Sequence, residues 1–307
     1  MDLGQHCQPK FVIPNAEIAG PPLAMDFSLD PLAQIRGAPP QRARGEIRAV
    51  FARAGSRTEA AKVFETGGLR LRFPRANGEC EAVIVNTGGG VIGGDRARIE
   101  LAATIGARVI ATTQSAEKIY RSDGALAKVD VRLVVGPGAS LVWAPQETLL
   151  FEGANFARRL VAEVAPDASL LIVEATVFGR LAHGETCIDA AFRDDWRISR
   201  GGKLLFAEAV RIENAGAALD RPAIGRGARA IATLIWVDPN APNRLDELRS
   251  ALDSVAQAPG CALEAGVSVV DDALVARLVS PSPPRLRAAL IAAIRALRGR
   301  EPPRLWS

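Results

Sequence analysis

Five glycines in seven residues, 88–94, form the motif in this sequence that most resembles a ligand-binding loop. Gly88, Gly90 and Gly93 fit the pattern G-x-G-x-x-G and follow an apolar run typical of a strand. In dinucleotide-binding proteins such glycines allow a tight turn, and pyrophosphate binds at the N-terminus of the next helix. Residues 95–104 instead alternate between apolar and polar types, which favours a strand. A turn between strands is therefore preferred, with an NAD(P)-binding oxidoreductase as the alternative.

Carboxylates beside or inside apolar strands are the next candidates for chemistry. Glu147 and Glu152 flank the apolar residues 149–151. That spacing would suit acid–base work or cation binding, although such charges more often lie on a solvated surface. Glu174 interrupts an otherwise apolar strand and needs a partner there, for which Arg180 is the candidate.

A histidine beside a carboxylate forms a third candidate. His183 precedes Gly184 and Glu185, an arrangement that would suit a proton shuttle or a pair of metal ligands. A lone histidine in a turn is more often structural. The chain has two histidines, and its four cysteines include no C-x-x-C pair. These counts exclude a site built on several histidines and a zinc knuckle.

Composition and motif searches narrow the function classes further. No G-x-S-x-G nucleophile elbow and no phosphate loop are present, and the net charge of +4 includes no dense basic run interleaved with aromatics. Nucleic acid is therefore not expected as a partner. Neither a signal peptide nor an apolar run of about 18 residues is found, so we expect a cytoplasmic protein without membrane contact. A β scaffold that binds other proteins and a dinucleotide enzyme both stay open.

Repeated segments indicate the architecture that must position these residues. Strand–turn–strand patterns at residues 99–109, 131–141 and 160–170 start 32 and 29 residues apart, and residues 196–206 form a fainter fourth copy. Repeats of this period are typical of stacked units that bury a core only together. We therefore expect an all-β dominated, layered body, sandwich-like and largely antiparallel.

Helices and a tail complete the expected organisation. Helical periodicity predicts two helices near the C-terminus, at residues 243–256 with Asn243 as the cap and at residues 285–298. Residues 1–41 carry seven prolines and are expected to be an extended or disordered tail. Residues 42–307 are then expected to form a single domain.

Four motifs in order and spacing carry a family resemblance. They are GGGVIGGD (88–95), TTQSAEKIYRS (112–122), APQETLLFEGA (144–154) and GRLAHGE (179–185). Together they resemble the urease accessory protein UreD family, also called UreH. The resemblance implies a layered, β-helix-like fold and a maturation factor that is not an enzyme. It also implies that the protein binds apo-urease and the accessory proteins UreF and UreG and helps to deliver nickel to urease. The resemblance implies that Ni²⁺ is bound only transiently and that no cofactor is tightly bound.

The resemblance singles out motif residues as architecture or contact surface, and large rings and arginine are common at interface cores. These residues are Gly93, Gly94, Asp95, Thr113, Lys118, Tyr120, Arg121, Ser122, Pro145, Gln146, Arg180 and Gly184. A path for Ni²⁺ must attract the ion without holding it, which scattered carboxylates would do. The candidates for that path are Asp95, Glu147, Glu152, Glu174 and Glu185, with His183 as an addition particular to this chain.

Overall fold

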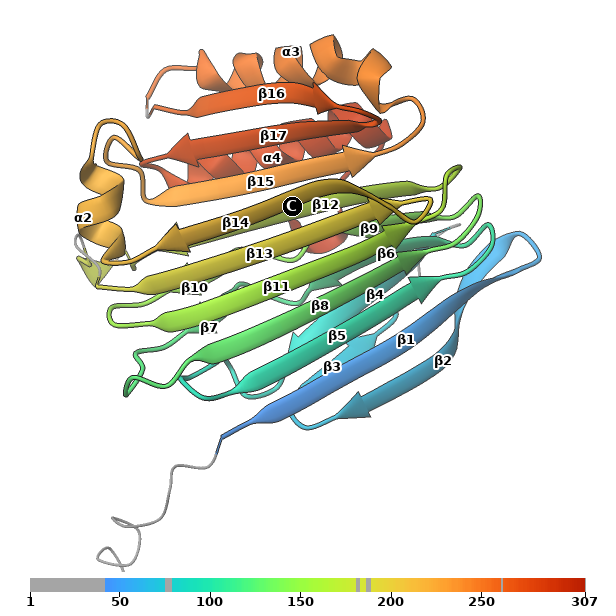
Figure 1. Ribbon diagram of the computed structural model, residues 1–307, viewed down its shortest axis with the longest axis horizontal. Coiled ribbons are helices and arrows are strands. Elements are labelled where there is room, and N and C mark those ends of the chain that lie inside the picture. The colour runs from blue at the N-terminus through green and yellow to red at the C-terminus, as the bar shows by residue number, and fades with distance from the viewer. Residues whose placement is uncertain (1–41, 75–78, 181–182, 186–188, 261, 307) are drawn as a thin grey trace, which may run out of the picture. The chain divides into compact units, whose positions relative to one another are not determined.

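The computed structural model describes residues 42–74, 79–180, 183–185, 189–260 and 262–306. The segment Arg42–Ser307 forms one compact unit, in which two β-sheets lie one over the other (Figure 1). The tail predicted at residues 1–41 lies outside the described residues.

Sheet A is the seven-stranded sheet that faces the viewer in Figure 1. In spatial order its strands are β14 (Lys203–Ile212), β13 (Ala191–Arg200), β11 (Asn155–Val164), β8 (Ala127–Val135), β5 (Arg96–Ala103), β1 (Arg44–Ala54) and β2 (Arg57–Thr66).

Sheet B is the ten-stranded sheet that lies behind sheet A and extends beyond its upper edge in Figure 1. Its main path is β16 (Glu264–Val270), β17 (Ala273–Ser280), β15 (Ala230–Val237), β12 (Ser169–Phe178), β9 (Ser140–Trp143), β6 (Arg108–Thr113), β4 (Cys80–Asn86) and β3 (Leu69–Arg72). Two short strands continue it sideways, with β10 (Thr148–Leu150) lying between β12 and β7 (Glu117–Ile119).

The chain winds alternately through the two sheets as a β-solenoid of about four turns. The layered, all-β prediction with helices near the C-terminus is therefore confirmed. The expected antiparallel pairing is wrong for the body of the solenoid, because β5, β8 and β11 pair in parallel, as do β6, β9 and β12. A chain that always winds in the same direction brings each strand back in the same direction. Antiparallel pairs occur where the winding starts and stops.

The three clear repeats are the passages from sheet A to sheet B. Backbone bonds stack their turns, with Gly136 donating to Ala103 at 2.8 Å and Ala165 donating to Val135 at 2.9 Å. Gly138, in the second turn, has a φ of 61°, which glycine adopts without strain. The fainter fourth copy differs, because β13 and β14 form an antiparallel hairpin that stays within sheet A.

Two hydrophobic cores result from the alternation along these strands. Inward residues such as Leu101 and Leu133 fill the space between the sheets, whereas outward residues of sheet B such as Val173 pack against helices. Strand β12 is buried on both faces. The helical elements are α2 (Ala215–Asp220), η2 (Ala241–Arg244), α3 (Leu245–Ala256), α4 (Pro283–Arg298) and η3 (Arg304–Trp306).

Both predicted helices are present, with different starts. The helix expected from residue 243 begins at Leu245 after a 3₁₀ turn, so Asn243 is not its cap. Helix α4 begins at Pro283 and ends before Gly299, whose φ of 61° suits the left-handed conformation that terminates a helix. The short helix α2 was not predicted.

Candidate functional site

Parts of all four sequence motifs meet at one corner of the solenoid, where loops lead into the strands of sheet A. Backbone hydrogen bonds stack these loops, since Tyr120 donates to Val91 at 2.9 Å and Phe151 donates to Ile119 at 3.0 Å. Gly179 continues the series in the next turn. We call this region the corner. Its described loop residues are 87–95, 120–126, 151–154, 179–180, 183–185 and 189–190.

Aromatic rings and an arginine form the centre of the corner. The Tyr120 and Phe151 rings meet edge to face with centroids 5.2 Å apart, and the Arg180 guanidinium lies 4.6 Å from the Phe151 centroid. Tyr120 is 36% exposed although its neighbours hold it on two sides. A hollow of about 450 Å³ opens here, lined by Tyr120, Arg121, Phe151, Glu152, Arg180 and Glu185.

The charges around this hollow are only partly neutralised. Arg180 donates from Nε to Glu185 at 2.8 Å and from its backbone nitrogen at 2.9 Å. The hydrogen bond from Arg180 lowers the pKa of Glu185 below its usual value, so this carboxylate stays ionised. Glu152 accepts a 3.3 Å bond from the Asp189 backbone. Arg121 has no ion pair or hydrogen bond within the described part of the chain, so it offers an unneutralised cation at the hollow.

The glycine motif supports the tyrosine. The Tyr120 hydroxyl donates to the Gly89 carbonyl at 3.1 Å. Gly90 has a φ of 152°, and a Cβ there would overlap the Tyr120 ring. A Cβ at Gly93 would overlap Ser122. The next element is strand β5 and not a helix, so the dinucleotide alternative is wrong, and these glycines make room for packing.

Asp95 braces the same loop. Its carboxylate is buried and accepts backbone bonds from Ala43 at 2.7 Å and from Ile92 at 2.9 Å. A Cβ at Gly94 would crowd the Arg42 side chain. These contacts fix the path of the chain into β5.

Lys118 and Ser122 shape the next loop. The Lys118 carbonyl accepts from the Val91 backbone at 2.8 Å, while its side chain is exposed. The Ser122 hydroxyl accepts from Gly124 at 3.1 Å and donates to the Ala125 carbonyl. Lys118 and Ser122 therefore fix the backbone on either side of Tyr120, which lies at the surface.

A second group of predicted residues lies away from the corner, beneath the segment that follows α4. Gln146 donates from Nε2 to the Leu305 carbonyl at 2.6 Å, and Glu147 accepts from Arg287 at 2.8 Å. The Trp306 indole donates to the Ala144 carbonyl at 2.9 Å. We call these contacts the C-terminal latch.

Two further motif residues complete the latch region. Thr113 accepts a 2.8 Å bond from the Gln146 backbone, and Pro145 is buried next to it. Because Glu147 is held by Arg287 and Glu152 lies at the corner, the two carboxylates serve different places and do not form an acid–base pair.

Glu174 has a different partner from the one predicted. It lies between the sheets, 2% exposed, and pairs with Arg158 of β11 and not with Arg180. Arg158 also binds Asp194 of β13, with Nε 3.0 Å from Oδ1. Two indoles complete this buried network, since Trp143 donates to Glu174 at 2.7 Å and Trp196 donates to Asp194 at 2.8 Å. Burial raises the pKa of Glu174 to about 7.

The sequence does hold a signal for these missed partners. Phe156, Arg158 and Leu160 are alternate residues of β11 and therefore lie on the same face of the strand. Because Phe156 and Leu160 are apolar, Arg158 is expected to point inward with them. Asp194 stands likewise between Phe192 and Trp196 of β13. A charged residue at an inward position of each of two neighbouring strands indicates a buried ion pair.

The candidates for a nickel path do not converge on one centre. No group of three or more His, Cys, Asp or Glu side chains in the described ranges is arranged to hold a metal ion. His183 is exposed beside Glu185, and Gly184 between them has a φ of 77° in an open turn. Glu152 and Glu185 line the hollow of the corner and Asp95 is buried beneath its loop, whereas Glu147 lies in the latch and Glu174 in the interior. The proposed path stays a prediction.

The fold and the corner define a class of protein: a β-solenoid whose described residues form no catalytic constellation at the corner, where aromatic rings and arginines lie at one end of the strands. The model of the family described as UreD urease accessory protein matches residues 43–307. The chain belongs to this family, which consists of non-catalytic maturation factors, and it therefore has a role in urease maturation. The resemblance noted from the four motifs is thus confirmed.

Relatives cover most of the chain. A protein named urease accessory protein UreD from Beijerinckia indica subsp. indica is 47% identical over 266 residues, which are 86% of this chain and 97% of the relative. A UreD from Methylobacterium sp. (strain 4-46) is 46% identical and covers 87% and 96% of the two chains. A UreD from Azorhizobium caulinodans is 43% identical and covers 87% and 97%. Among the helices that the structure describes, none is long and apolar enough to cross a membrane.

Proposed function

We propose that the protein is a scaffold of urease maturation that binds apo-urease, UreF and UreG and helps to deliver nickel to the urease active site. The observation that supports this proposal most directly is the convergence of motifs from four successive turns on the corner. Each motif contributes either a side chain of the hollow or a glycine that makes room for one.

The corner suits contact with another protein for physical reasons. Tyrosine supplies a large rigid contact area with a polar tip, and arginine supplies several donors, so both are enriched where interfaces have their strongest contacts. Tyr120 is held in place by Phe151 and by the Gly89 carbonyl, so little side-chain entropy remains to be lost on binding. Arg121 retains its donors for a partner.

Nickel transit is the second part of the proposal. Ni²⁺ accepts oxygen and imidazole ligands, and a transit site must bind it weakly enough to release it. Glu152 and Glu185 at the hollow each already accept a protein hydrogen bond, and His183 stands beside them. A passing ion would compete with those bonds and would therefore be held only briefly.

A pull-down from cells that carry the urease cluster tests the scaffold role. Tyr120→Ala and Arg121→Ala are expected to reduce co-purification of UreF at least about tenfold, in line with losses at interface hot spots. The matched controls are Ile105→Ala, an exposed apolar residue in a turn at the other end of the strands, and Arg197→Ala on the outer face of sheet A. Unchanged recovery of UreF, UreG and urease with both corner variants would contradict the proposal.

Nickel delivery needs a separate measurement. In complexes that still assemble, Glu152→Gln with Glu185→Gln is expected to lower the nickel content and activity of urease. The control is Glu163→Gln, an exposed glutamate on sheet A that pairs with Arg132. If urease is fully loaded by the corner double variant, these carboxylates have no part in transit.

A further inference from the structure

The outer face of sheet A carries a row of basic side chains that crosses the strands. Pairing register places one residue from each of six strands, all except β2, at the same level, at the end of the strands nearest the corner. We call it the basic row. From β1 to β14 its members are Arg44, Arg96, Lys128, Ala157, Arg193 and Arg211.

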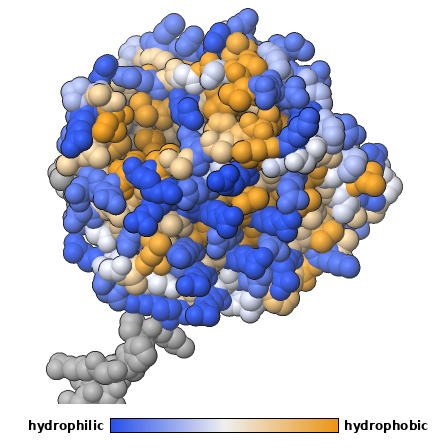
Figure 2. Space-filling model, viewed as in Figure 1, coloured by the Kyte–Doolittle hydropathy of each residue, from blue (hydrophilic) through white to orange (hydrophobic). Residues whose placement is uncertain are grey.

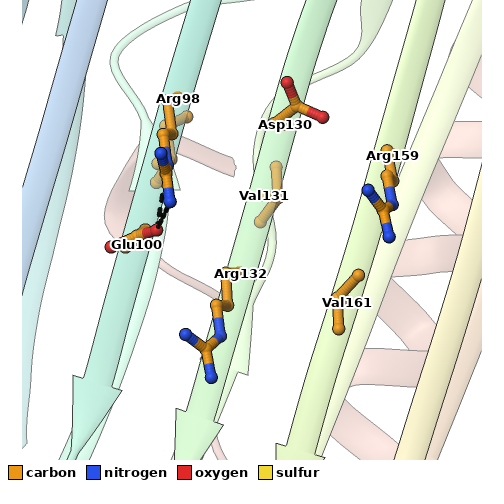
Figure 3. Close-up of a pocket in the computed structure, with 8 residues that line it drawn as sticks. Arg98, Glu100, Asp130, Val131, Arg132, Arg159 and Val161 are labelled. Atoms are coloured by element: carbon orange, nitrogen blue, oxygen red, sulfur yellow. Dashed lines mark hydrogen bonds and ion pairs between the residues drawn. The ribbon is translucent and has the colours of Figure 1, made fainter.

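The next row along the strands has a different composition. Two residues further on, the register aligns side chains whose signs alternate from strand to strand: Glu46, Arg98, Asp130, Arg159 and Asp195. Ion pairs link this row and the one beyond it, including Arg98 with Glu100, drawn with dashed lines in Figure 3. Arg98 also lies 4.0 Å from Glu46, and further along the strands Arg132 binds Glu163 at 2.8 Å. Glu46, Arg98 and Asp195 are thus ion-paired within the protein, and Asp130 and Arg159, of opposite sign, face each other across β8 and β11.

The basic row is not neutralised in this way. Arg211 binds Asp195 at 2.9 Å, but the side chains of Arg44, Arg96, Lys128 and Arg193 have no ion pair among the described residues. Adjacent strands lie about 4.8 Å apart, and like charges directly opposite each other destabilise a sheet. Alternating signs in the neighbouring row avoid this cost. Negative charge supplied from outside the chain would therefore reduce the repulsion between the side chains of the basic row.

We propose that the basic row binds an acidic α-helix of a partner protein, laid across the strands. Three to four helical residues advance about 4.5–6.0 Å, which matches the spacing of about 4.8 Å between strands. A helix with glutamates or aspartates on one stripe would thus meet one basic side chain on each of these strands except β11, where the row holds Ala157. An extended peptide repeats its side chains every ~6.8 Å on one face and would lose register. The row spans about 24 Å, equivalent to about 16 helical residues.

The surroundings of the row favour a helix over a nucleic acid. The face is dominated by hydrophilic residues (Figure 2), and the row and its neighbour contain no ring on which bases could stack. Carboxylates of the next row lie only about 6.8 Å along the strands and would repel a second line of phosphates. In a helix about 10 Å wide, basic residues flanking the acidic stripe would instead meet Asp130.

This surface is distinct from the corner, and it relies on the proposed function only in that the helix belongs to a protein partner. The proposal is tested by fluorescence anisotropy of the full chain with a labelled, stapled helical peptide of 18 residues. The peptide carries glutamates spaced three and four residues apart, so that they lie on one stripe of the helix. The variant is Lys128→Gln with Arg193→Gln. The matched control is Arg132→Gln with Arg197→Gln, which removes the same charge from the same strands, β8 and β13.

The basic-row variant is expected to weaken peptide binding about five- to tenfold at low salt, since two exposed pairs are lost, and the control less than twofold. Equal weakening by both variants would overturn the proposal, because attraction would then follow net charge alone. Equal binding of a stapled peptide of the same composition with its glutamates on all sides would also overturn it, as would stronger binding of a single-stranded oligonucleotide of equal charge. Tyr120→Ala is expected to leave peptide binding unchanged, so failure at the corner is distinguishable from failure here.

Discussion

The indole of Trp143 donates a 2.7 Å hydrogen bond to the carboxylate of Glu174 in the interior between the two sheets. Arg158 approaches the other oxygen of the same carboxylate. Burial nevertheless dominates and raises the pKa of Glu174 to about 7, from an ordinary value of 4.5. The folded protein therefore binds a proton at this site more tightly than the unfolded chain does.

Glu174 is expected to make stability depend on pH in an unusual direction for a carboxylate. A group with a raised folded-state pKa contributes stability that is fully present below pH 4.5 and is lost as pH rises through about 7. The free energy of unfolding of the wild type, relative to Glu174→Gln, should fall by up to about 3 kcal/mol between pH 5 and pH 8. Urea titrations of both proteins at these pH values measure it. A relative stability that rises with pH would show that Arg158 outweighs burial.

Arg158 should be among the most sensitive positions of the fold. Its replacement by methionine leaves Glu174 and Asp194 buried without their cation, which typically costs about 3–5 kcal/mol. Arg159, the next residue, is exposed on the outer face of sheet A, so Arg159→Met should change stability by less than about 0.5 kcal/mol. Chemical denaturation of the pair checks this. Similar losses for both variants would mean that the buried network is not stabilised by its arginine.

Alternation and repetition in the sequence were sufficient to predict a layered β body, but not its winding. Residues 99–103 and 127–135 alternate because one face of each strand is buried. That pattern is the same for parallel and antiparallel neighbours. The direction depends on where residues 113–126 carry the chain after sheet B, and no local pattern there distinguishes a return from a further turn.

The candidate site was predicted where local motifs define it and missed where distant residues do. Tyr120 and Arg121 belong to one motif, Phe151 to a second and Arg180 to a third, and the stacking of turns brings these motifs together. The partner of Glu147 is Arg287, 140 residues away on a helix, and nothing near either residue indicates the contact. Long-range ion pairs are set by tertiary packing, so proximity in sequence gave the wrong partner for Glu174.

The C-terminal latch should contribute strongly to stability through Trp306. Its side chain is almost fully buried, and the Arg287 guanidinium lies 5.0 Å from its ring centroid. Trp306→Ala is expected to cost about 3–5 kcal/mol, as large-to-small changes in cores do. Leu305→Ala, at an adjacent residue that is 38% exposed, should cost less than about 1 kcal/mol. Thermal unfolding gives both values, and hydrogen exchange should rise around Ala144 in the first variant only. A mild effect of Trp306→Ala would show that α4 docks without the latch.

Gly90 should be intolerant of any side chain, because two constraints act on it together. Its φ of 152° is one that L-residues rarely adopt, and a Cβ would overlap the Tyr120 ring. Gly90→Ala is therefore expected to displace Tyr120, to destabilise the fold by about 2 kcal/mol or more, and to reduce UreF recovery as Tyr120→Ala does.

Gly89→Ala is the matched control, since Gly89 also has a positive φ, of 73°, but has open space around it. It should cost only about 1 kcal/mol and keep the partner. Near-ultraviolet circular dichroism reports on the single tyrosine together with the tryptophans. We expect a changed spectrum and a reduced recovery of UreF for Gly90→Ala only. Equal spectra and equal UreF recovery for the two variants would contradict the prediction that the glycine loop supports Tyr120.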